Sequence, residues 1–98
     1  MTTKITQLEK QVLDAIQTFT AENFTSENGN WAYVHYLSYT IDPSKLRGLI
    51  TTLQSKGILN LIEDFKNYVE VSKDYFVETG NQTATGSPEI KFTNIEIK

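Results

Sequence analysis

The chain has 98 residues and a formal net charge of −3, with twelve acidic and nine basic side chains. This length accommodates one domain with a modest core, and no apolar run approaches the ~20 residues of a membrane-spanning helix. The sequence has no cysteine and one histidine, which excludes disulfides, iron–sulfur clusters and thiolate or multi-histidine metal sites. We therefore expect a small cytoplasmic binding module without a cofactor or metal, and not an enzyme.

The charge is distributed unevenly along the chain. Residues 1–57 contain five basic and five acidic side chains, so they sum to zero. Residues 58–98 contain four lysines and seven acids, so they carry the whole net charge of −3. Within the first part, residues 42–57 have a net charge of +2, from Lys45, Arg47 and Lys56 against Asp42. The acidic composition therefore does not exclude a locally basic surface.

A first helix is predicted over residues 6–23. Apolar residues recur there at three- and four-residue steps, which places them on one helix face. They are Ile5, Leu8, Val12, Ala15, Ile16 and Phe19. Thr6 and Glu9 have the spacing of a capping box, in which each side chain satisfies the other residue's backbone amide. The segment thus carries its own start signal.

A second, short helix is predicted over residues 31–39, after a Ser- and Asn-rich loop at 24–30. Trp31, Val34 and Leu37 follow helical spacing. Three tyrosines at three-residue steps form a second stripe on the same segment. They are Tyr33, Tyr36 and Tyr39. Tyrosine and valine also favour strands, so a strand is the alternative; the helix start that follows favours the helix.

A third helix is predicted over residues 43–56. Asp42 can cap its first turn, and Pro43 occupies a position where no amide hydrogen bond is lost. Leucines and isoleucine at 46, 49, 50 and 53 form an apolar stripe. Gly57 is suited to the positive φ that often ends a helix.

The rest of the chain alternates with a period of two, which indicates strands. A parity shift near Thr93 and Asn94 suggests a bulge in the last strand. The segment between Gly80 and Pro88 contains no large apolar residue and is predicted to be a mobile loop. The predicted elements are strands at 58–63, 68–77 and 89–97, with a turn at 64–67 and the loop at 80–88.

Residues 41–59 read I-D-P-S-K-L-R-G-L-I-T-T-L-Q-S-K-G-I-L. A capped, amphipathic helix that closes with a Leu-x-x-Lys-Gly-Ile-Leu segment before a strand resembles the winged helix-turn-helix family. The resemblance extends over about residues 5–72 in the order of elements. It implies an α+β fold for one domain over residues 1–98, a winged helix with three N-terminal helices, a β-hairpin wing and a further C-terminal strand.

The resemblance also implies a function, which is binding of double-stranded DNA by a transcriptional regulator. The outward residues of the third helix would enter the major groove, and the hairpin turn would lie near the DNA backbone. A homodimer would double the number of contacts. The implied DNA-binding residues are Ser44, Lys45, Arg47, Gly48, Thr51, Thr52 and Lys66.

Two observations qualify this expectation. A glycine in the middle of a helix costs about 1 kcal/mol relative to alanine, so Gly48 suggests close approach of the backbone to the core or to a partner. The hairpin turn begins with the acids Glu63 and Asp64, whereas a DNA-binding member of the family would carry a basic wing tip. The alternative is therefore a winged-helix module for protein–protein interaction that does not bind DNA. Its expected partner surface consists of Tyr33, Tyr36 and Tyr39.

Overall fold

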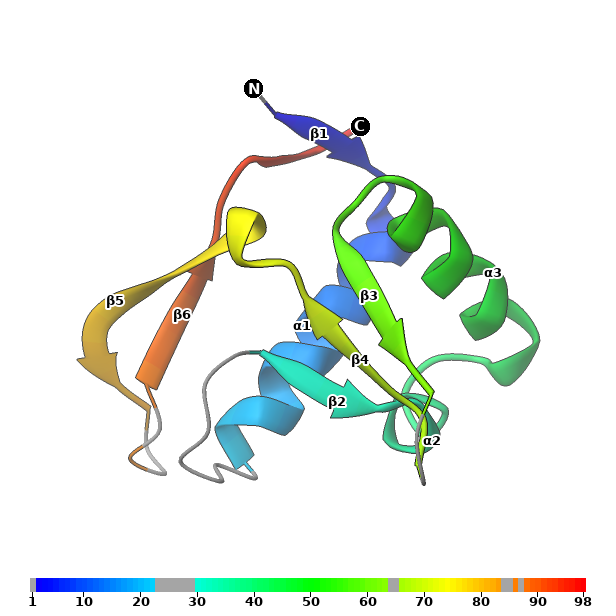
Figure 1. Cartoon of the computed structure of the whole chain (residues 1–98), viewed down its shortest axis with the longest axis horizontal. Helices are drawn as coiled ribbons and strands as arrows, with labels where there is room; N and C mark the ends of the chain where they lie inside the picture. The colour runs from blue at the N-terminus through cyan, green and yellow to red at the C-terminus, as the bar shows by residue number, and fades with distance from the viewer. Residues whose placement is uncertain (1, 23–29, 64–65, 84–85, 87) are drawn as a thin grey trace.

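The structure is a computed structural model, and it describes residues 2–22, 30–63, 66–83, 86 and 88–98. Three α-helices, a short 3-10 helix and seven strands form an α+β arrangement (Figure 1). In chain order they are β1 (Thr3–Ile5), α1 (Gln7–Glu22), β2 (Trp31–Tyr33), α2 (Val34–Leu37), α3 (Pro43–Ser55), β3 (Leu59–Ile62), β4 (Tyr68–Val71), η1 (Lys73–Tyr75), β5 (Phe76–Gln82), β6 (Pro88–Phe92) and β7 (Ile95–Ile97).

Helix α1 supplies much of the core. Its first turn has the predicted capping box: the Glu9 amide donates to Thr6 Oγ1 at 3.1 Å, and the Thr6 amide donates to Glu9 Oε1 at 2.8 Å. Its apolar face is buried against α2, α3 and the central sheet. The buried members of that face are Val12, Leu13, Ala15, Ile16 and Phe19. The prediction of this helix is confirmed to within one residue at each end.

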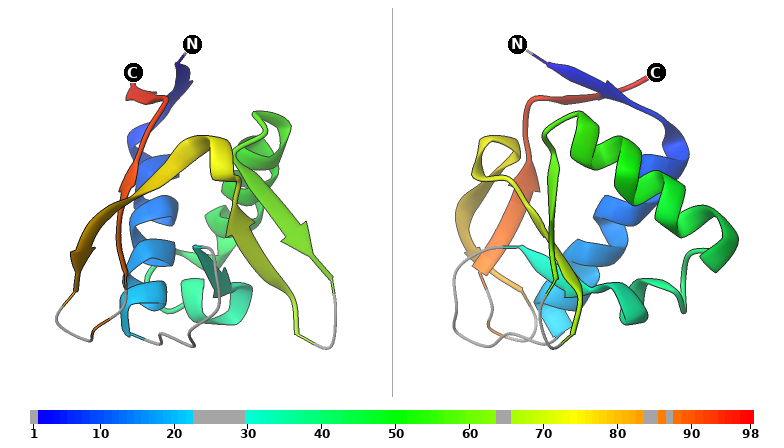
Figure 2. Two further views of the ribbon diagram at one scale, coloured as in Figure 1. Left: turned by 60° about the vertical axis from the view of Figure 1, so that its left-hand side comes forward. Right: turned by 45° about the vertical axis from the view of Figure 1, so that its right-hand side comes forward.

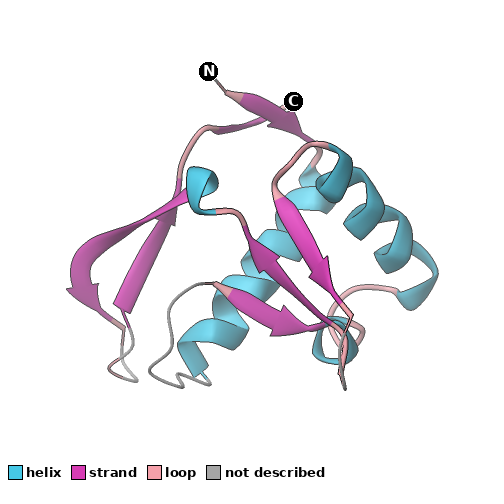
Figure 3. Ribbon diagram, in the orientation of Figure 1, coloured by secondary structure: helices cyan, strands magenta, loops and turns pink. Residues whose placement is uncertain are grey.

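A three-stranded antiparallel sheet with the order β2–β4–β3 covers the other side of the core (Figure 3). Strand β4 lies in the middle, and Val69 and Val71 point from it into the core. Strand β2 joins the sheet because Trp31 pairs with Glu70 and Tyr33 pairs with Tyr68. The sheet therefore links the segment after α1 to the hairpin after α3.

Helix α3 has the predicted signals at both ends. The Asp42 side chain accepts from the Ser44 amide, and Pro43 is the first helical residue. At the other end Gly57 has a φ of 78°, the Gly57 amide donates to the Gln54 carbonyl, and the Ile58 amide donates to the Leu53 carbonyl. These two bonds form a Schellman motif, which satisfies carbonyls that a helix end leaves free. The prediction for this segment is confirmed, with the end one residue earlier.

Two further strand pairs complete the fold (Figure 2). Strands β5 and β6 form an antiparallel arm whose β6 side packs against α1. Strands β1 and β7 pair in parallel, with Thr3 opposite Ile95 and Ile5 opposite Ile97. The two ends of the chain consequently lie side by side at one end of the molecule.

The predicted winged-helix fold is wrong. That prediction had three N-terminal helices, then a hairpin and one further strand. In the structure β1 precedes α1, β2 separates α1 from α2, and the C-terminal part contains the β5–β6 arm and the parallel strand β7. The physical reason is that β1 and β7 are each only three residues long and become strands by pairing with each other across the whole chain, which no local pattern indicates.

Four local predictions also need correction. The strand predicted over 68–77 is interrupted, because β4 covers 68–71, η1 covers 73–75, and β5 begins at 76. Residues 31–39 do not form one helix, because 31–33 pair with β4 as a strand and only 34–37 are helical. Residues 80–82 and Pro88 belong to β5 and β6 rather than to a loop, while 84, 85 and 87 lie outside the described residues. The parity shift near 93–94 is not a bulge: Asn94 has a φ of 60°, and the chain turns there from β6 into β7.

Candidate functional site

The candidate site is the exposed face of α3 together with the groove between α3 and the β3–β4 hairpin. All six α3 residues singled out from the sequence are exposed, as is Lys66 at the start of the chain leading into β4. Helix periodicity places Ser44, Gly48 and Thr51 in one strip along the outward face, with Lys45 on one side and Arg47 on the other. The structure thus gathers these side chains on one surface.

All three hydroxyls of this set are already engaged within the protein. Ser44 Oγ lies 2.9 Å from Asp42 Oδ1, in the cap of α3. Thr52 Oγ1 donates to Glu9 Oε2 at 2.8 Å, between α3 and α1. Their sequence-based assignment as contact residues did not anticipate these structural roles. The hydroxyl of Thr51 donates to the Arg47 carbonyl at 3.0 Å, within α3.

The third cation of this segment, Lys56, is half-buried and forms an ion pair with a buried carboxylate. Its ammonium donates to Glu9 Oε1 at 2.7 Å, and Glu9 is only 2% exposed. Burial alone would raise the pKa of the Glu9 carboxyl, but the Lys56 ammonium, the Thr6 amide and the Thr52 hydroxyl lower it to about 2. The net charge of +2 read from residues 42–57 therefore overstates what α3 offers to a partner.

Gly48 faces open space. A β-carbon built on it would have no heavy atom within 4 Å. The sequence left two explanations for this glycine, close approach to the core or to a partner, and the core is now excluded. Position 48 has no side chain, so another molecule could come close to the helix backbone there.

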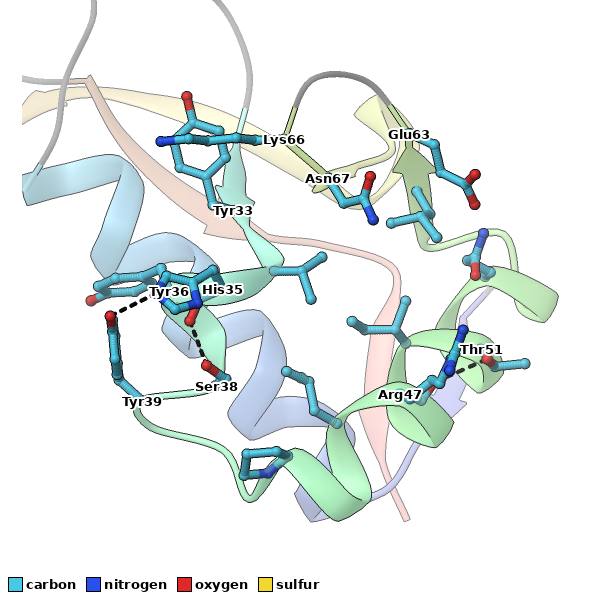
Figure 4. A pocket seen from close by; sticks show the side chains of 16 residues that line it. Tyr33, His35, Tyr36, Ser38, Tyr39, Arg47, Thr51, Glu63, Lys66 and Asn67 are labelled. Carbon is cyan, nitrogen blue, oxygen red and sulfur yellow. Dashed lines mark hydrogen bonds between the residues drawn. The ribbon is translucent and has the colours of Figure 1, made fainter.

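The groove beside α3 has a volume of about 810 Å³ (Figure 4). Arg47 and Thr51 line it from α3, and Lys66 and Asn67 line it from the hairpin side. Its floor is apolar. The floor residues are Val34, Leu46, Ile50 and Leu61. Within the part of the chain that the structure describes, Lys45, Arg47 and Lys66 form no ion pair. The pKa of the Asp42 carboxyl is lowered, first by hydrogen bonds from Ser44 and then by the charge of Lys45.

The three tyrosines of the expected partner surface line the same groove. Tyr33 and Tyr36 pack against Phe19 at centroid distances of 5.7 and 4.8 Å, and Tyr39 is 73% exposed. Burial, followed by the charge of Glu22, raises the pKa of Tyr36. The hydroxyl of Tyr39 and Nε2 of His35 are 2.7 Å apart, so the one histidine is held at the groove mouth.

The groove itself was not predicted from the sequence, and neither was the Glu9–Lys56 contact. Both join residues that are far apart along the chain: Glu9 and Lys56 are 47 positions apart. The sequence carries only an indirect signal, since Glu9 belongs to a capping-box pattern and Lys56 lies at the end of a predicted helix. Among the described segments, no three His, Cys, Asp or Glu side chains are grouped in a way that could hold a metal ion.

None of the helices in the described segments has the length and apolar character needed to cross a bilayer. A scan against protein-family models gives no match, and no curated protein or solved structure is significantly similar to the chain.

Proposed function

We propose that the protein binds double-stranded DNA through the exposed face of α3, as a transcriptional regulator would. The observation that carries the proposal is the make-up of that face: a strip of small side chains between Lys45 and Arg47, open to solvent along its length. A helix of 13 residues is about 20 Å long, and the major groove, about 12 Å wide, admits an α-helix.

The charges support a defined orientation. Arg47 can make a bidentate contact with guanine, and Lys45 and Lys66 can contact phosphates. The acids of η1 and strands β5 to β7 are largely balanced by Lys73, Lys91 and Lys98, so residues 73–98 carry only −1 of the net charge of −3. Those acids are Asp74, Glu78, Glu89 and Glu96. The remaining −2 belongs to residues 58–72, which contain the β3–β4 hairpin beside α3, so a bound duplex must contact the α3 cations while it avoids these acids.

The proposal predicts modest affinity with a measurable salt dependence. The two phosphate contacts give a slope of about −1.8 for log K against log salt, which is a loss of about 12-fold between 50 and 200 mM salt. Two copies on one duplex would double that slope. A slope near zero with binding still present would mean that α3 cations are not the contacts.

The direct test is fluorescence anisotropy with a labelled duplex of mixed sequence at about 50 mM salt. We expect saturable binding, and a loss of at least tenfold in affinity for the double variant Lys45→Ala and Arg47→Ala. The matched control is Lys73→Ala with Lys91→Ala, which removes the same charge from η1 and β6. Absence of binding at micromolar protein, or an equal loss in both double variants, would refute the proposal.

A further inference from the structure

The groove between α2, α3 and the hairpin is a candidate site for a second kind of ligand. Its volume of about 810 Å³ falls within the ~300–1,000 Å³ of typical small-molecule sites. Four apolar side chains from three different elements, α2, α3 and β3, form its floor. This floor removes the body of a ligand from water, while the opening leaves room for a polar group at the rim.

The aromatic wall of the groove is held in place by contacts behind it. Tyr36 packs on Phe19, with centroids 4.8 Å apart. Tyr33 packs on Trp31 at 5.1 Å and carries the Lys66 ammonium 5.4 Å from its ring centroid. Side chains that are already fixed lose little conformational entropy when a ligand binds. Flat faces held in this way favour a flat, aromatic body.

The charged side chains at the rim determine which sign of charge the ligand should carry. Arg47 lines the groove from α3 and Lys66 from the hairpin side, with Glu63 as the acid that lines it (Figure 4). Among the described lining residues, the Arg and Lys charges exceed the acidic charge by one, which favours an anion. A guanidinium without an ion-pair partner in the described residues is suited to a planar carboxylate or a sulfonate, which it can bind through two N–H groups.

We propose that this groove binds a flat aromatic molecule that carries one acidic group, with its rings against the tyrosines and the apolar floor and its acid on Arg47. Binding of this ligand does not require DNA, although Thr51 and Lys66 belong both to the groove lining and to the proposed DNA-binding face. Arg47 is shared, so a bound acid would reduce the contact of that residue with DNA.

The probe for the test is 8-anilinonaphthalene-1-sulfonate, added to the folded chain without DNA. We expect saturable, blue-shifted fluorescence with about one probe per chain, and weaker binding of N-phenyl-1-naphthylamine, which has the same rings without the sulfonate. Arg47→Gln should weaken binding of the sulfonate by about tenfold and leave binding of the neutral amine unchanged. Tyr39 is exposed and is not part of the hydrophobic core. Tyr39→Ala should therefore weaken binding of both probes without disturbing the fold.

Lys45→Gln is the matched control, because it removes the same charge from the side of α3 away from the groove. Equal binding of the sulfonate by both charge variants and the parent chain would overturn the proposal. So would fluorescence that does not saturate, or that reports several probes per chain. These readings are taken in the absence of DNA, so they are separate from success or failure of the DNA titration.

Discussion

At the scale of single residues, Glu9 makes the most consequential set of contacts. Its carboxylate accepts from the Thr6 amide, the Thr52 hydroxyl and the Lys56 ammonium, all within 2.8 Å. It therefore caps α1 and also fixes the C-terminal half of α3 against α1. Because Glu9 is buried, removing its charge leaves the Lys56 ammonium without compensation in a partly buried place.

Glu9→Gln should lower the free energy of unfolding by about 2 kcal/mol or more, measured by urea denaturation at pH 7. The matched control is Asp14→Asn, which breaks the exposed i,i+4 pair with Lys10 and should cost less than about 0.5 kcal/mol. The pH dependence follows from the lowered pKa. Stabilisation by the Glu9 carboxylate is present above its ordinary pKa of 4.5 and is lost as the pH falls towards about 2. Acid sensitivity in this range that is identical in the parent chain and in Glu9→Gln would contradict this role.

At the scale of elements, α3 is specified by its own sequence and yet contains one residue that weakens it. Asp42, Pro43 and Gly57 set its ends through local hydrogen bonds and a positive φ. Gly48 lies in the middle, and a β-carbon at this position would have no heavy atom within 4 Å. A residue with a higher helix propensity would therefore meet no steric obstacle among the described residues, so nothing in the fold requires a glycine at this position.

Gly48→Ala should raise the free energy of unfolding by about 0.5–1 kcal/mol, because alanine restricts the unfolded chain and fits a helical φ. The same change should weaken DNA binding in the anisotropy assay, since the added methyl group keeps the duplex from the helix backbone. A more stable variant with unchanged affinity would show that the backbone at Gly48 is not approached. The control is Ser55→Ala, a substitution further along the same exposed strip, which should leave the DNA affinity unchanged.

At the scale of the whole molecule, the chain ends act as one structural unit. The Thr3 amide donates to the Asn94 carbonyl at 2.8 Å, and the Lys98 amide donates to the Ile5 carbonyl at 2.9 Å. Ile5 is fully buried, and Ile95 packs partly against the core. A parallel pair of three-residue strands has only marginal stability by itself. This pair is stabilised because it covers the buried side chain of Ile5.

A chain that ends at Thr93 should lose about 2–3 kcal/mol of its free energy of unfolding, since it exposes Ile5 and removes Ile95. Thermal and urea denaturation of the truncated and full chains measure this loss. Glu96→Gln changes an exposed position of β7 and should stay within about 0.5 kcal/mol of the parent chain. Equal stability of the truncated and full chains would mean that β7 does not help to bury Ile5.

The sequence by itself determined the two long helices and their ends. The Thr6–Glu9 capping box, the Asp42 cap and the glycine at 57 are interactions between residues close in the chain, so their spacing is enough to predict them. It also placed the exposed residues of α3 correctly, because helical period alone decides which side chains face outward.

Only the tertiary structure decided the rest. Residues 31–33 have helical spacing but become a strand because their backbone groups pair with β4. The chain ends become strands by pairing across more than ninety positions. Lys56, which the sequence presents as a surface cation, is held by Glu9, and the groove exists because α2, α3 and the hairpin meet around an apolar floor. In each case the deciding contacts are between residues far apart in the sequence, and their free energy outweighs the local preference.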